Sequence, residues 1–124
     1  MSEDRFSGWL EDMLKAARQA CSYVEGIDRE RFLADPRTQQ AVAMNVLIIG
    51  EVAAKLIERY PERLTTYPSV AWASMKGMRN RLAHGYFEVD TGVVWETVRR
   101  ALPVLIEQLT AILRVEHRGP HGTV

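Results

Sequence analysis

The sequence predicts an all-α fold, an up-and-down bundle of four long helices and one short helix. Apolar residues recur every three or four positions, aspartate and proline mark helix starts, and no segment shows the alternation of a β-strand. With 124 residues, 47% of them hydrophobic, the chain is long enough for one packed core. We therefore expect a single domain over residues 1–116, followed by a flexible tail over residues 117–124.

The first predicted helix spans about Ser7 to Glu25. One face carries apolar residues spaced by four, three, four and three: Leu10, Leu14, Ala17, Cys21 and Val24. Gly26 can adopt the left-handed conformation that closes a helix. Asp28 is then expected to cap a short helix that runs to about Ala34.

A second long helix is predicted from Pro36 to about Tyr60, because Asp35 is a favourable N-cap and proline suits the first helical position. Its middle, residues 44–49, is apolar nearly all round, which places it at the centre of the bundle or at a subunit interface. Asn45 lies within this run, and a buried amide must be hydrogen-bonded. Its partner is expected either across a subunit interface or within the chain.

The last helix is predicted from about Gly92 to Val115, with Asp90 or Thr91 as its cap. Pro103 removes one backbone donor and crowds the carbonyl of Arg99, so we expect a kink there. A seam of apolar residues spaced by three and four suits near-parallel packing. The seam consists of Trp95, Val98, Leu102, Leu105, Leu109 and Ile112.

Charge and composition limit the classes of function. The 16 basic and 16 acidic side chains give no net charge, so a nucleic-acid partner would be contacted locally. No run of about 18 apolar residues predicts a spanning helix, and the charged N-terminus is unlike a signal peptide. A single cysteine, Cys21, cannot form an internal disulfide. We therefore expect a cytoplasmic protein without a membrane partner.

The remaining long helix is expected to start at a Ser69 cap, run to about Ala83 and end at Gly85. It carries Lys76 and Arg81, part of a local basic cluster. Charge-balanced surface helices give similar clusters, so the cluster alone is weak evidence for a nucleic-acid site.

Three chemistry-bearing side chains lie near the end of this helix. Arg79 offers a planar fork of donors for phosphate, His84 can move protons near neutral pH, and Tyr86 adds a phenol. Arg79 and His84 are about 140° apart on an ideal helix, so they converge only if the helix ends near His84. From the residues alone, a surface salt bridge for Arg79 and a helix C-terminal contact for His84 are the favoured interpretations.

Other candidates are weaker. Glu51 follows a glycine in the second long helix, where an ion pair with Lys55 is favoured over a carboxylate facing a site. His117 and His121 fall in the predicted tail and lack ligand spacing. No Cys/His cluster, glycine-rich phosphate loop or Ser-His-Asp set is apparent, so we expect neither a metal nor a cofactor.

The sequence resembles the HepT-like toxins (DUF86), a branch of the HEPN superfamily of small helical RNases. Arg79, His84 and Tyr86 match the family signature of arginine, four residues, histidine, one residue and tyrosine. The resemblance covers roughly Leu10 to Leu113. Further similar segments are 35–42, 48–54, 67–72, 75–80, 90–95 and 102–103.

The resemblance implies a HEPN-like bundle that pairs as a homodimer, with motifs from both subunits facing a shared cleft. It implies a metal-independent endoribonuclease in which the ribose 2′-hydroxyl attacks phosphorus, leaving a cyclic phosphate and a free 5′-hydroxyl. Arg79 would stabilise the phosphate and His84 would be the general acid or base. Asn80, Tyr86 and Glu51 would support them. Lys76 and Arg81 would contact RNA.

The resemblance also implies a toxin–antitoxin pair, in which an MntA-like minimal nucleotidyltransferase antitoxin adenylylates Tyr86. The added phosphate and bulk would block RNA beside His84. A different class of function stays open: a non-catalytic helical dimer that acts as the binding partner of a nucleotidyltransferase. A nucleotide-binding sensor using Arg79 and Lys76 is a third interpretation.

Overall fold

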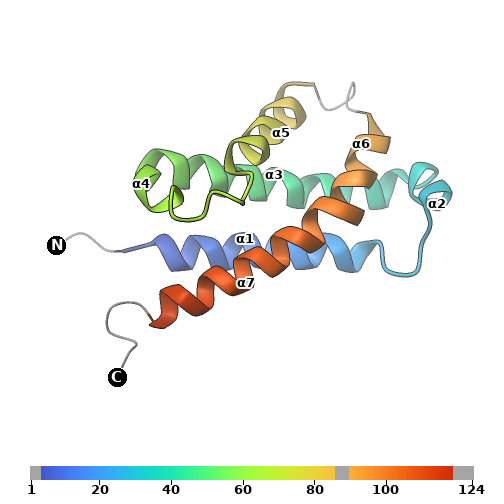
Figure 1. The fold of residues 1–124 in the computed structure, drawn as a ribbon. Helices are drawn as coiled ribbons and strands as arrows, with labels where there is room; N and C mark the ends of the chain where they lie inside the picture. The colour runs from blue at the N-terminus through green and yellow to red at the C-terminus, as the bar shows by residue number, and fades with distance from the viewer. Residues whose placement is uncertain (1–3, 86–89, 119–124) are drawn as a thin grey trace.

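The protein is an all-helical bundle in a computed structural model that describes residues 4–85 and 90–118 (Figure 1). Four long helical segments and two short helices make up these residues, and no strand occurs among them, so the predicted fold class is confirmed. The elements are α1 (Phe6–Tyr23), α2 (Arg29–Leu33), α3 (Pro36–Arg59), α4 (Pro61–Leu64), α5 (Trp72–Gly85), α6 (Thr91–Glu96), the π-helical turn η2 (Thr97–Ala101) and α7 (Leu102–Arg118). The last three follow one another without a break and form one long helix.

The long helix α3 lies between α1 and α5, and α1 packs in turn against α7 (Figure 1). The short helix α2 meets α6, the start of the last long helix, at one end of the bundle (Figure 1). The apolar seam predicted for the last helix is buried along its whole length, from Trp95 to Ile112. The predicted face of α1 is buried as well, with only Cys21 half-buried. Burial of these two faces is therefore what joins the first and last helices.

Three helix starts follow local capping signals that the sequence shows directly. The Asp28 side chain accepts a hydrogen bond from the backbone N–H of Arg31 at 2.9 Å. Asp35 accepts one from Thr38 at 3.2 Å, and Pro36 occupies the first turn of α3. At α6, Asp90 accepts from the backbone N–H of Gly92 at 2.8 Å. These three predicted caps are confirmed.

Helix boundaries differ from the predictions where the signal was ambiguous. Helix α1 ends at Tyr23, and Gly26, with φ of 74°, lies in the turn that follows. Helix α3 ends at Arg59, close to the predicted boundary, and Pro61 then starts α4, a short helix that was not predicted, because proline suits a first helical position. Helix α5 begins at Trp72, later than a Ser69 cap would place it, and continues through Gly85.

The predicted distortion near Pro103 takes the form of a π-helical turn just before the proline. In this turn the backbone N–H of Leu102 bonds to the carbonyl of Thr97, five residues back. Such a turn is one of the local irregularities that accompany bending of a helix. Beyond it, α7 reaches Arg118 and so extends two residues into the predicted tail.

The middle of α3 is exposed on one side. Met44 is 59% exposed and Ile48 is 40% exposed, whereas Asn45 is buried and donates to the Ala41 carbonyl at 3.1 Å. The hydrogen bond of Asn45 is thus internal. Contrary to the expectation from sequence, α3 is long and apolar enough by length and composition to cross a membrane. A core helix of a folded domain meets the same criteria, and half of the apolar window of α3 is buried.

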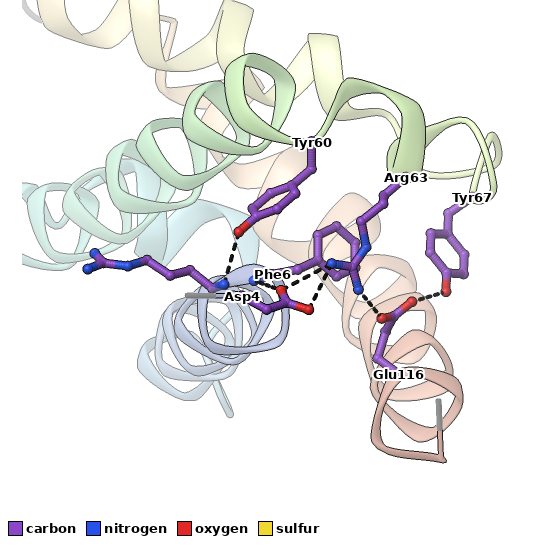
Figure 2. A network of polar contacts seen from close by, with 7 residues as sticks. Asp4, Phe6, Tyr60, Arg63, Tyr67 and Glu116 are labelled. Carbon is purple, nitrogen blue, oxygen red and sulfur yellow. Dashed lines mark hydrogen bonds and ion pairs between the residues drawn. The ribbon is translucent and has the colours of Figure 1, made fainter. Parts of the chain in front are cut away.

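An arginine joins the N-terminus, α4 and α7 in a polar network that the sequence did not predict (Figure 2). The guanidinium of Arg63 binds Asp4 at 3.0 Å and also pairs with Glu116. It lies 4.1 Å from the ring of Phe6. The Tyr67 hydroxyl donates to the second oxygen of Glu116 at 2.6 Å. The network fixes the end of the bundle where α1 begins and α7 finishes.

Candidate functional site

Arg79 is held at the contact between α5 and α3. Its side chain is 21% exposed, and its Nη1 lies 2.6 Å from Oε1 of Glu51 on α3. The Nε atom is buried and makes no hydrogen bond within the described residues. The guanidinium is thus anchored through Nη1, and its Nη2 makes no hydrogen bond within the described residues, so Nη2 is the donor left for an anionic ligand.

The predicted ion pair between Glu51 and Lys55 is wrong. The Glu51 carboxylate instead pairs with Arg79 across the contact between α3 and α5. This agrees with the alternative interpretation, in which the carboxylate faces a site. The ammonium of Lys55 lies 5.9 Å from the ring centroid of Trp9 on α1. Because Glu51 and Arg79 are 28 positions apart in the chain, only the crossing of α3 and α5 brings them together.

One side of α5 carries three of the other predicted site residues. Lys76, Asn80 and His84 are spaced by four and therefore form one stripe along the helix. Asn80 and His84 are exposed, and the side chain of His84 makes no hydrogen bond or ion pair within residues 4–85 and 90–118. His84 lies in the last turn of α5, where the helix dipole favours a cation, but it makes no hydrogen bond to the last carbonyls within those residues.

Arg79 and His84 do not converge within one chain. Helix α5 is continuous through both residues, so the helical turn keeps their side chains about 140° apart. The alternative, in which the helix ends early enough for them to meet, is not realised. Tyr86, the predicted modification site, lies outside the described residues.

Arg81 lies apart from the other basic residues of α5. It lines a largely apolar cavity of about 840 Å³ between α3, α5 and the last helix. Met75 and Met78 share this lining, whereas Arg79 and His84 do not. The spacing of these residues on α5 places the cavity on the opposite side of the helix from Lys76 and Asn80. The structure therefore separates Arg81 from the other predicted RNA-binding residue, Lys76.

Sequence reasoning assigned no role to Gly50, which lies where α5 crosses α3. A Cβ atom at Gly50 would be 2.2 Å from the Cβ of Arg79. The available signal was a glycine in a helix interior, where it costs about 1 kcal/mol relative to alanine. A glycine at such a position can indicate a close approach of another backbone.

An α-helical bundle that carries Arg79, Asn80 and His84 on the helix α5 is consistent with a small helical nuclease. The family model described as "Ribonuclease HepT-like" matches residues 13–112. The chain therefore belongs to the HepT-like ribonuclease family, as its signature residues suggested.

Individual relatives agree with this family. A protein of Thermococcus cleftensis named as a probable ribonuclease HepT is 40% identical over 97 residues, covering 78% of this chain and 86% of its own. A protein of Caldanaerobacter subterraneus subsp. tengcongensis with a provisional RNase name is 33% identical over 108 residues, covering 87% of this chain and 94% of its own. Among solved structures, none matches the chain significantly.

Proposed function

We propose that this chain is a metal-independent endoribonuclease and the toxin of a toxin–antitoxin pair. The observation that carries the proposal is Arg79, an arginine of the family signature whose guanidinium is anchored to Glu51 through Nη1 and whose Nη2 makes no hydrogen bond within the described residues. The family match and the RNase names of the relatives supply the substrate class.

The proposed reaction uses only groups of the protein and the RNA. The ribose 2′-oxygen attacks the adjacent phosphorus and loses its proton to a general base, while the bond from phosphorus to the 5′-oxygen breaks. A general acid returns a proton to that oxygen, giving a 2′,3′-cyclic phosphate and a 5′-hydroxyl. Arg79 stabilises the charge that develops on the phosphate oxygens, and His84 transfers a proton. Asn80, next to His84 on the same stripe, orients the phosphate or the imidazole.

The test is cleavage of an RNA pool in EDTA by the wild type and by His84→Ala, followed across pH. We expect fragments with cyclic-phosphate ends from the wild type, and a loss of at least about 10²-fold in the variant. Circular dichroism of both proteins checks that His84→Ala is folded, so that a lower cleavage rate reflects the chemistry and not unfolding. An inert wild type, shown by mass spectrometry to be unmodified at Tyr86, would instead favour the non-catalytic binding partner of a nucleotidyltransferase.

We further propose that the enzyme is a homodimer, because one chain leaves Arg79 and His84 apart. The outward face of α3 is suited to pair with a second copy. Its exposed Met44 and Ile48 flank Leu47 at the centre of the helix. Arg37 lies ten residues before Leu47, and Glu58 lies ten residues after Ile48.

An antiparallel, two-fold pairing of α3 about this centre is self-complementary. It buries the apolar residues against each other and sets Arg37 of one helix opposite Glu58 of the other. Glu51 lies on the same face, so both pairs of Glu51 and Arg79 come to the contact between the copies. The proposed active site thus draws on both subunits.

Ile48→Glu is expected to convert the dimer to a monomer in light scattering and to abolish cleavage, because the two-fold axis sets the new charges close together. Val115→Glu is the matched control, since Val115 is 55% exposed on α7. A dimer that survives Ile48→Glu, or one that Val115→Glu disrupts, would rule out this face of α3.

The regulatory part of the proposal concerns Tyr86, the residue directly after α5. We propose that an MntA-like minimal nucleotidyltransferase adenylylates its hydroxyl, adding a negative phosphate beside the RNA site. Mass spectrometry of the chain coexpressed with such an enzyme should find the adenylyl group on the peptide that contains Tyr86. Tyr86→Phe should then stay unmodified and escape inhibition.

A further inference from the structure

Gly50 lies in the interior of α3, at the crossing with α5, and is buried. Glycine at such a position lowers helix stability by about 1 kcal/mol relative to alanine. Its backbone is helical, and the only positive-φ glycine of the described residues is Gly26. A need for an unusual backbone conformation therefore does not explain why a glycine occupies position 50. The lack of space for a side chain beside its Cα does.

Arg79 occupies the space that a side chain at Gly50 would need. An ideal Cβ would lie 2.2 Å from the Cβ and 3.0 Å from the Cγ of Arg79, and 2.7 Å from the carbonyl oxygen of Met75. Carbon atoms in favourable contact are about 3.5–4 Å apart. Two of the three neighbours are a backbone oxygen and a Cβ, which cannot rotate away. An added methyl group would therefore displace α5 by about 1 Å or more.

Two other helical glycines lack this crowding. Gly77 lies on α5 two residues before Arg79, and Gly8 lies on α1, and neither would bring a Cβ within 4 Å of another atom. At Gly92 the nearest atom would be a side-chain oxygen of Asp90 at 3.0 Å, so the 2.2 Å approach to Arg79 is the tightest among these glycines.

Gly50 and the next residue hold the two ends of the same side chain. Because Gly50 has no side chain, the Cβ and Cγ of Arg79 occupy the space beside its Cα. Glu51 binds the Nη1 atom of Arg79 at 2.6 Å. The buried Nε lies between these two contacts along the side chain and has no hydrogen-bond partner among the described residues. The base and the tip of Arg79 are therefore fixed by consecutive residues of α3.

We infer that Gly50 is a positioning residue for Arg79, and that with Glu51 it sets where the guanidinium meets the scissile phosphate. The inference rests on the proposed ribonuclease function. Misplacement of a catalytic group by about 1 Å can lower a rate by about 10²-fold. Because Gly50 is small, α5 approaches α3 closely enough to place Arg79 for the reaction.

The test compares Gly50→Ala with Gly77→Ala, which adds the same methyl group to open space on the helix of Arg79. We expect Gly50→Ala to lower kcat about 10²-fold with a smaller change in KM, and Gly77→Ala to stay within about twofold of wild type. Binding of a 2′-O-methyl oligoribonucleotide should lose one phosphate contact in Gly50→Ala, seen as a salt-dependence slope reduced by about 0.7. A wild-type kcat and slope in Gly50→Ala would overturn the inference.

A stability measurement keeps the inference testable if Gly50→Ala folds poorly. Arg79→Gly should destabilise the wild type, because it puts a glycine into α5 and removes the pair with Glu51. In the Gly50→Ala background the same change should raise the melting temperature, because it removes the two Arg79 atoms that the new methyl group meets. The inference is wrong if Arg79→Gly destabilises both backgrounds equally.

The arginine Nε–H signal in a nitrogen-15 NMR spectrum distinguishes failure of the inference from failure of the proposed function. The buried Nε–H of Arg79, assigned with Arg79→Lys, should shift in Gly50→Ala and remain in place in Gly77→Ala. This readout does not require RNA cleavage. If the wild type cleaves no RNA but the signal responds as expected, only the ribonuclease proposal fails.

Discussion

Arg79→Ala is expected to reduce RNA cleavage by about 10³-fold. Removing a donor that stabilises a developing oxyanion costs about 10²–10³-fold, and arginines that serve phosphoryl transfer contribute more. Arg79→Lys should recover only part of the loss, because an ammonium keeps the charge but not the planar fork. The measurement is single-turnover cleavage of a defined RNA by purified protein.

The matched control is Arg100→Ala. Arg100 is 83% exposed, and its ion pair within the described residues is with Glu96 one turn away on its own helix. Its loss should leave the cleavage rate within about twofold of wild type, since an exposed pair of this kind contributes about 0.3–0.5 kcal/mol. Equal losses in the two variants would show that general positive charge, and not the position of Arg79, supports the reaction.

Arg63→Ala is expected to lower the free energy of unfolding by about 2 kcal/mol, a fall of roughly 5–10 °C in melting temperature. The variant leaves Glu116, whose side chain is only 16% exposed, without its cation and uncovers the ring of Phe6. The contact with Asp4 contributes little, because that carboxylate is 65% exposed. Denaturant unfolding measures the loss, and an effect no larger than that of Arg100→Ala would contradict it.

The same network should give the fold a defined pH range. The backbone N–H of Phe6, together with Arg63, holds the pKa of Asp4 below its usual 3.8, so this stabilisation exists above that value and is lost as the pH falls through the lowered pKa. Burial, with the hydrogen bond to Glu116, raises the pKa of Tyr67 to about 12. Its contribution is complete below the ordinary pKa of 10 and is lost as the pH rises through about 12. Asp4→Asn should flatten the acid side of the profile, and Tyr67→Phe the alkaline side.

Much of the fold was predictable because its signals are local. The caps at Asp28, Asp35 and Asp90 bond to backbone groups two or three residues away, so the sequence places donor and acceptor together. The buried seam of the last helix follows from helical periodicity in the same way. Boundaries were less certain where one residue type has two uses, as with Pro61, which ended one helix and began another.

The family of the chain and the residues of its signature were also available from sequence, since Arg79, His84 and Tyr86 lie within eight consecutive positions. Their catalytic role stays a prediction. The sequence also favoured Lys55 as the partner of Glu51, because charges four apart are neighbours on any helix. The actual partner is Arg79, which the fold brings from another helix.

By itself, then, the sequence determined the helices, their caps and buried faces, and the signature that defines the family, because each is written in residues a few positions apart. The tertiary structure alone decided the crossing of α3 and α5, and with it the pairing of Arg79 with Glu51 and the contact of Arg79 with Gly50. It also decided the network around Arg63, which joins segments more than 50 residues apart. Such contacts depend on the angle and distance at which packed helices cross, and the packing of side chains from the whole bundle sets that geometry.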